Sequence, residues 1–136
     1  MVEEPYVDDV DEPDPKLNRI TNAIIGACIE VHRQLGAGYL EAYYERALEK
    51  EFRLRNINFV RQQRFEVLYK GDVIGTGEAD FVIEGLVLLE IKSVEKLAPV
   101  HTSQVISYLK ALRLRLGLLV NFNSDLLKNG VKRIAR

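Results

Sequence analysis

The stretch Glu78–Lys92, EADFVIEGLVLLEIK, forms the centre of the predicted sheet. Its second half is almost entirely apolar, which is typical of a central strand buried on both faces. Its first half continues an alternating pattern, and Glu84-Gly85 between the halves predicts a turn. The stretch therefore predicts two antiparallel strands, Val73–Ile83 and Leu86–Lys92, joined by a hairpin.

Three charged residues stand out in this stretch, because charges are rare in buried strands. Asp80, Glu90 and Lys92 give the pattern D-x9-E-x-K. Glu90 and Lys92 point to one face, since side chains alternate along a strand. Carboxylate oxygens suit Mg²⁺ or Mn²⁺, which can activate a water for attack on a phosphodiester, and Lys92 could orient that water. Taken alone, so short a pattern fits an ion pair at a strand end better.

The hairpin register tests whether the two carboxylates can share a metal. A two-residue loop would pair Asp80 with Leu89 and point it away from Glu90. A three-residue loop, Glu84–Leu86 with a left-handed residue at or near Gly85, puts Asp80 opposite Glu90 instead. We therefore predict an odd loop or a bulge.

Two amphipathic helices are predicted before the strands. The first covers Leu17–Leu35 and stops at Gly36, and the second runs from about Leu40 to Arg55. The second helix has an apolar stripe formed by Tyr44, Leu48 and Phe52. Glu41 lies on the same face as this stripe. A carboxylate there either stabilises the helix N-terminus or serves as a ligand for metal or water.

The remaining elements complete an α/β pattern. Phe65–Tyr69 alternates like a strand, and Val100–Leu112 repeats like a helix, with Gln104 and Tyr108 on one face. Leu116–Phe122 is a further predicted strand. The order is helix, helix, three antiparallel strands, helix, strand. It predicts a mixed sheet that starts antiparallel and is flanked by helices.

Composition bounds the class of protein. The chain has 136 residues and 15.5 kDa, which suits a single domain. No apolar run approaches the roughly 20 residues of a membrane span, and the acidic N-terminus does not resemble a secretory signal. Cys28 is the single cysteine, so an internal disulfide and cysteine-based zinc sites are excluded. These features predict a cytoplasmic protein without membrane segments.

Charge divides the chain into two parts. Residues 1–16 hold seven acidic side chains against Lys16, and we expect a flexible, solvated tail. Residues 17–136 hold 18 basic and 13 acidic side chains, a formal charge of +5, which is compatible with a polyanionic partner. Candidates for phosphate contact, or for plain solvated charges, are Arg61, Arg64, Lys96, Lys132 and Arg133, the last two in a basic end at Val131–Arg136.

Three polar residues, Gln62, Gln63 and His101, have two interpretations each, and His32 has one. Gln62 and Gln63 could touch substrate, although solvated surface positions are the simpler interpretation. His101 either lies near the site or helps to start its helix. His32 falls toward the polar side of the first helix, which favours a structural role.

Several motifs together resemble the GxxExxY proteins, a branch of the PD-(D/E)XK nuclease superfamily. Gly38, Glu41 and Tyr44 supply the name motif within GYLEAYY. The resemblance runs from about Leu17 to the C-terminus. It includes IEVHRQLGAGYLEAYYERAL, EADFVIEGLVLLEIKSVEKL, HTSQVISYLK and GLLVNF. The residues before Asp80 are Glu-Ala, so the proline of the superfamily's name is missing.

The resemblance implies a restriction-endonuclease-like core with the site at one end of the sheet. Asp80, Glu90, Glu41 and the Ile91 carbonyl would hold Mg²⁺ or Mn²⁺, with Lys92 assisting the water. Gln104 and Tyr108 match the Q-x-x-x-Y element of RecB-like exonucleases, which would position the site or the strand. The implied function is metal-dependent hydrolysis of nucleic acid, with DNA favoured over RNA.

Two other classes of function remain open at this stage. A nuclease fold without catalysis could bind nucleic acid or a protein partner, since fold does not fix function. A structural oligomerisation domain would not need the acidic residues. A domain of this size could also need a partner, or a second copy in a homodimer, to grip a duplex.

Overall fold

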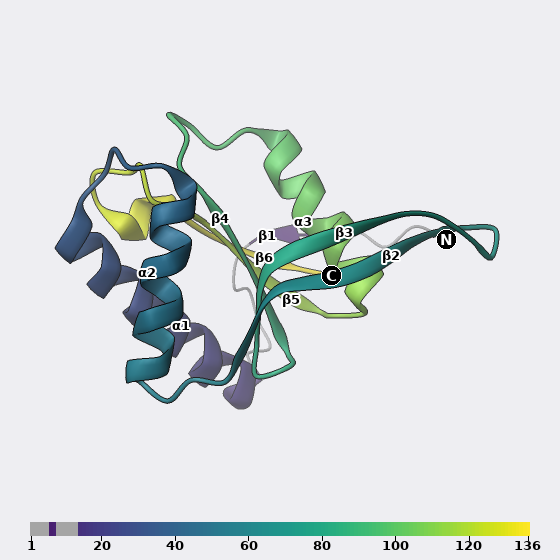
Figure 1. The fold of residues 1–136 in the computed structure, drawn as a ribbon, viewed down its shortest axis with the longest axis horizontal. Helices are drawn as coiled ribbons and strands as arrows, with labels where there is room; N and C mark the ends of the chain where they lie inside the picture. The colour runs from purple at the N-terminus through teal and green to yellow at the C-terminus, as the bar shows by residue number, and fades with distance from the viewer. Residues whose placement is uncertain (1–5, 8–13) are drawn as a thin grey trace.

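In the described part of the chain, residues 6–7 and 14–136, six strands form one mixed sheet with helices on both faces (Figure 1). The structure is a computed structural model. Its elements are β1 (Tyr6–Val7), α1 (Pro15–Leu35), α2 (Glu41–Leu54), β2 (Phe59–Tyr69), β3 (Asp72–Ile83), β4 (Val87–Lys92), α3 (Pro99–Leu112), β5 (Leu116–Asn121), the 3₁₀ turn η1 (Leu127–Gly130) and β6 (Val131–Ala135).

The strand order across the sheet is β1-β6-β5-β4-β3-β2. Strands β2, β3 and β4 form the predicted antiparallel meander, and β4 is central and buried. Strand β5 runs parallel to β4, because α3 carries the chain back across the sheet before β5 begins. The predicted α/β class and the mixed sheet are confirmed.

Two strands differ from the sequence-based expectation. Strand β6 occupies the segment expected only to be a basic end, and it pairs with β5 and β1. Strand β2 begins at Phe59, well before the expected start at Phe65. In β6 the polar side chains bind neighbouring elements; Arg133 Nη2, for example, donates to Asn18 Oδ1 at 2.8 Å. In β2 the half-buried positions that follow Phe59 hold the polar residues Arg61 and Gln63, so the sequence shows no apolar alternation there.

The expected flexibility of residues 1–16 falls mostly outside the described residues. Within that range, the backbone of Tyr6–Val7 pairs with β6. Helix α1 begins at Pro15, where proline suits the first helical position, and Asp14 Oδ1 accepts the amide of Lys16 at 2.8 Å. None of the described helices is long and apolar enough to cross a membrane.

Two apolar clusters lie on opposite faces of the sheet. Leu89 and Leu118 pack with α1 and α2, whereas the alternate residues Leu88 and Leu119 pack with Val105 and other residues of α3. Figure 1 shows the same division, with α1 and α2 together on one side and α3 on the other. Any strand residue can therefore be assigned to the α2 face or the α3 face by the helix that it contacts.

The β3–β4 turn has the predicted odd length. Ile83 pairs with Val87, which leaves the three residues Glu84–Leu86 in the loop. Glu84 and Gly85 have φ of 54° and 68°, so two consecutive residues take the left-handed conformation. This register continues toward Asp80 opposite Glu90, the arrangement that a shared site requires.

Gly85→Ala should weaken the fold through this turn. Alanine disfavours the left-handed conformation, so the free energy of unfolding should fall by about 1 kcal/mol. Urea denaturation measures the change. The matched control is Gly75→Ala, at a position with open space around the added Cβ. An equal loss of stability in both variants would contradict this account of the turn.

Candidate active site

The candidate site lies where β3 and β4 separate. Their ladder ends at the pair Phe81–Leu89, one step before Asp80 and Glu90. Beyond it, the Asp80 amide donates to Glu90 Oε2 at 2.7 Å, and the Ile91 amide donates to Asp80 Oδ2 at 2.8 Å. Each carboxylate thus accepts a hydrogen bond from a main-chain amide at the point where the ladder ends. We call this arrangement the carboxylate fork.

Burial governs the charge state of the fork. Glu90 is only 4% exposed. Burial, followed by the negative charge of Asp80, raises the pKa of Glu90 to about 8 from an ordinary 4.5. Burial is also the main reason that the pKa of Asp80 rises to about 6 from 3.8, with the charges of Glu45 and Glu41 adding to it. Without a bound metal ion, the fork therefore retains about one proton near neutral pH.

Lys92 lies at the end of β4 and is half-buried. Its positive charge lowers the pKa of both Asp80 and Glu90, although by less than burial raises them. The predicted grouping of two carboxylates with one ammonium is therefore present in the structure.

Helix α2 brings two further carboxylates toward the fork. Glu41, at the first helical position, is exposed instead of buried as its apolar stripe suggested, but its charge still raises the pKa of Asp80 and Glu90. Glu45, one turn later, is only 8% exposed and affects the Asp80 pKa more than Glu41 does. Glu45 was missed, although its position four residues after Glu41 puts it on the same helical face.

The loop before α2 is fixed by the residues of the GxxExxY pattern. The Tyr44 hydroxyl donates to the Gly36 carbonyl at 2.6 Å and accepts the Tyr39 amide at 3.2 Å. Gly38 has a φ of 106°, which only glycine adopts readily. The Ser93 hydroxyl donates to the Tyr39 carbonyl at 2.8 Å, tying this loop to the segment just after Lys92. These contacts place the start of α2, and Glu41 with it, beside the end of β4.

Helix α3 places Gln104 and Tyr108 on the other side of the site. Burial, followed by the charges of Glu90 and Asp80, raises the pKa of the Tyr108 phenol, and a hydrogen bond with the Gln104 side chain opposes the rise. Gln104 Oε1 is buried without a hydrogen-bond partner in the described structure. This residue pair lies beside the fork, and one of its oxygens could take a further ligand.

Gln62 was expected to be a solvated surface residue, and it is exposed, but its side chain also has a partner within the protein. Its Nε2 lies 2.7 Å from both carboxylate oxygens of Glu45, so it binds α2. Its φ is 54°, a left-handed value inside a strand. The sequence does not indicate such a residue, because a left-handed conformation is expected at glycine or asparagine and not at glutamine.

The histidines and most basic candidates have partners within the protein. His101 Nδ1 accepts the Ala98 amide at 2.9 Å, which starts α3, and His32 Nε2 lies 2.8 Å from the Ser124 carbonyl. Three of the five candidates for phosphate contact bind protein groups: Arg61 binds Glu45 and Glu49, Arg133 binds Asn18 and Thr21, and Lys132 lies 3.4 Å from Thr102. Arg64 and Lys96 are exposed.

A family model described as the PD-(D/E)XK nuclease superfamily matches residues 18–134. The chain belongs to this superfamily. Comparisons with curated proteins and with solved structures found no match. PD-(D/E)XK nucleases generally use divalent metals, so the donor groups of this chain can be tested against that requirement.

The fork fits a divalent cation in charge but not yet in ligand number. The hydrogen bonds of the fork use Oδ2 of Asp80 and Oε2 of Glu90, and the other oxygen of each carboxylate lies outside them. A cation there would oppose the repulsion that raises the pKa of Glu90. Across residues 6–7 and 14–136, however, no group of three or more His, Cys, Asp or Glu side chains is placed to hold a metal. Glu41 would have to move toward the fork to complete the expected set.

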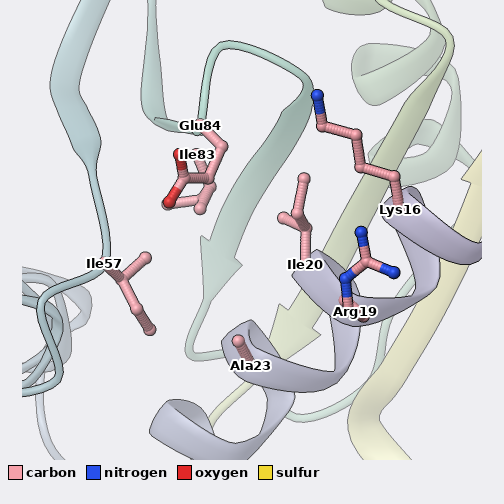
Figure 2. Close-up of a pocket in the computed structure, with 7 residues that line it drawn as sticks. All are labelled: Lys16, Arg19, Ile20, Ala23, Ile57, Ile83 and Glu84. Atoms are coloured by element: carbon pink, nitrogen blue, oxygen red, sulfur yellow. The ribbon is translucent and has the colours of Figure 1, made fainter.

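A separate pocket of about 300 Å³ lies at the turn end of β3 (Figure 2). Lys16 and Arg19 of α1 and Glu84 of the turn line it together with apolar side chains. Asp80 lies three residues before Ile83, the β3 residue that lines this pocket, which is about 10 Å along the strand. This pocket is therefore distinct from the fork.

Glu90→Gln should stabilise the metal-free PD-(D/E)XK domain at high pH. The Glu90 pKa is about 8 in the fold and near 4.5 when unfolded, so its ionisation destabilises the fold increasingly between these values. The amide still accepts the Asp80 N–H but cannot ionise. We expect a gain of about 4 kcal/mol at pH 8.5 in EDTA, and little change at pH 4.5, measured by urea denaturation.

The control for this experiment is Glu95→Gln, at an exposed position beyond β4. It should change stability little at either pH. A gain in Glu90→Gln that is equally large at pH 4.5 would show that altered packing, instead of removed charge, is responsible.

Proposed function

We propose that this protein is a Mg²⁺- or Mn²⁺-dependent nuclease that hydrolyses phosphodiester bonds of nucleic acid. The observation that carries the proposal is the carboxylate fork, in which two neighbouring acids are held in a buried position where their charges are unfavourable without a cation. Membership of the PD-(D/E)XK superfamily supports the reaction class. We further propose that the chain falls in the GxxExxY branch, and the loop that presents Glu41, shaped by Gly38 and Tyr44, supports this.

The proposed roles follow from position. Asp80 and Glu90 would hold the metal, with Glu41 and the Ile91 carbonyl completing the ligand set. When bound, the cation supplies Lewis-acid activation of the phosphoryl group and lowers the pKa of a bound water. Lys92, on the same face of β4 as Glu90, orients the attacking water and stabilises negative charge that develops on the phosphate.

Gln104 and Tyr108 are proposed to position the site from the α3 side. The buried Oε1 of Gln104 lacks a hydrogen-bond donor. Either a metal-bound water or a substrate group could donate to it. Tyr108 keeps its phenol proton, because burial and then the neighbouring acids raise its pKa, and can therefore donate a hydrogen bond.

A groove of about 610 Å³ between β2 and α3 supports a polyanionic substrate. Arg64 of β2, Lys110 of α3 and Arg113 directly after α3 line it, opposed by one acid, Glu66. Its walls also carry apolar side chains, including Val67 and Leu68. The Phe65 ring, which lines this groove, lies 4.7 Å from the Tyr108 ring. Tyr108 in turn lies near enough to Asp80 and Glu90 for their charges to raise its pKa. Phosphates and bases match this combination of cations and apolar surface.

We propose DNA over RNA as the substrate and the cytoplasm as the location. Formation of a homodimer is a prediction of its own. A second candidate function is a catalytically silent module that binds nucleic acid or a protein. The exposed position of Glu41, and the lack of a three-ligand group among the described residues, favour this alternative. It differs from the nuclease proposal in predicting binding without cleavage.

Glu90→Gln and Lys92→Met should each lower nuclease activity about 100-fold or more, because one removes a ligand charge and the other removes the cation beside the water. The measurement is cleavage of labelled single- and double-stranded DNA and RNA, with Mg²⁺, with Mn²⁺ and in EDTA. Lys50→Met, an exposed substitution on α2, is the control. Cleavage that survives in both site variants would point to a contaminant or another site. Binding without cleavage by the wild type would favour the silent module.

Lys110→Gln should weaken nucleic-acid binding and reduce its salt dependence. Loss of one phosphate contact to a single strand lowers the slope of log K against log salt by about 0.7. Arg64→Gln on the opposite wall should act similarly, whereas Lys50→Gln on the α2 face should leave the slope unchanged. Fluorescence anisotropy with a labelled oligonucleotide between 50 and 200 mM salt, about the range in which such effects are large, measures it. Unchanged slopes in both groove variants would show that nucleic acid does not bind along the groove between β2 and α3.

A further inference from the structure

Strand β2 changes faces of the sheet as it passes the candidate site. Arg61 binds Glu45 and Glu49 of α2, whereas the Phe65 ring contacts Tyr108 of α3. In a regular strand Arg61 and Phe65 would share a face. Because α2 and α3 cover opposite faces, β2 must turn over between these two residues.

Strand β3 turns over at the matching position. Phe81 belongs to the cluster on the α2 face, while Ala79 belongs to the cluster on the α3 face. The residue between them is Asp80. The hairpin therefore crosses from one face to the other at the step where Asp80 enters the carboxylate fork.

The crossing is centred on Gln62. The ladder between β2 and β3 has the pairs Arg61–Phe81 and Gln63–Ala79, but the rung between Gln62 and Asp80 is missing. Gln62 has a φ of 54°, an unfavourable backbone conformation for a residue with a side chain. Strain of this kind persists only where surrounding contacts hold it, and it concentrates at functional sites.

Glu45 supplies the contact that holds Gln62. The Gln62 amide nitrogen lies 2.7 Å from both oxygens of Glu45, and Arg61 Nε donates to the same carboxylate at 3.4 Å. A buried carboxylate beside Asp80 is unfavourable, since its charge raises the pKa of Asp80. These donors offset that cost and anchor the crossing to α2.

We propose that Glu45 and Gln62 are positioning residues of the active site, which hold the β2–β3 crossing so that Asp80 faces Glu90. The proposal rests on the nuclease function in one respect only, namely that Asp80 and Glu90 bind the metal. The hydrogen-bonded pair of Glu45 and Gln62, called the Glu45–Gln62 couple below, acts through the backbone. This is because Gln62 lies opposite Asp80 across the missing rung. Neither residue needs to touch substrate or metal.

Gln62→Gly is the decisive variant, since glycine tolerates the left-handed backbone but removes the bond to Glu45. Hydrogen exchange at the Asp80 and Ile91 amides reports the fork directly, because both amides donate to its carboxylates. We expect exchange at least about tenfold faster in the variant, and Mn²⁺ affinity weaker by about 10- to 100-fold, as for other groups that orient ligands. Substrate KM should change little compared with kcat.

Two further variants separate positioning from other roles. Glu45→Gln with Gln62→Glu restores an amide–carboxylate couple with its polarity reversed, and should return exchange and Mn²⁺ affinity to within about threefold of the wild type. Thr76→Gly, in the outer part of the same hairpin, controls for general loosening and should change neither. The urea midpoint of every variant shows whether it folds.

Three results would overturn the proposal. If hydrogen exchange at the Asp80 and Ile91 amides and Mn²⁺ affinity in Gln62→Gly equal those of the wild type, the Glu45–Gln62 couple does not hold the fork. The same loss in Thr76→Gly would show that any loosening of the hairpin suffices. Weaker Mn²⁺ binding in Glu45→Gln with normal exchange, not rescued by the swap, would make Glu45 a ligand in its own right. If the wild type itself binds no Mn²⁺ and cleaves nothing, the nuclease function fails, and the exchange data alone decide the positioning role.

Discussion

Where the β3–β4 ladder ends, the main-chain amides of Asp80 and Ile91 do not continue the pattern of the sheet, and a buried amide must find an acceptor. In this protein the acceptors are the side chains of Asp80 and Glu90. The sheet is therefore completed at this point by two acids, which keeps like charges close together in a buried place. The same pair of carboxylates lowers the local stability of the metal-free domain and raises its affinity for a cation. Such a trade-off is common where function needs an unfavourable arrangement.

The surrounding elements each restrain this pair from a different direction. Helix α2 contributes Glu45 and the loop held by Tyr44, and α3 contributes Tyr108. Strand β5 contributes Asn121, whose side chain binds both the amide and the carbonyl of Val94 just beyond β4. These restraints come from segments far apart in the sequence, so the site is a property of the whole tertiary structure and not of one motif.

The sequence predicted features that depend on local patterns. Helix stripes located α1 to α3, and loop length with chain direction predicted the register that brings Asp80 to Glu90. Gln62 is exposed as expected, but its backbone conformation was not foreseen, because nothing local indicates a left-handed glutamine within a strand. Glu45 was missed because its reason for burial, a partner on β2, appears only after folding. Strand β6 was missed because its basic side chains bind α1 and α3 and hide the alternation.

The three-residue turn at Glu84–Leu86 also bears on the order of folding. Asp80 and Glu90 meet through one of the most local contacts in the sheet, whose closure entropy is small. The parallel pairing of β4 with β5 must wait until α3 has formed a crossover, which makes it slower. We therefore expect the acidic pair to be brought together early, while the groups that restrain it from α3 and β5 arrive later.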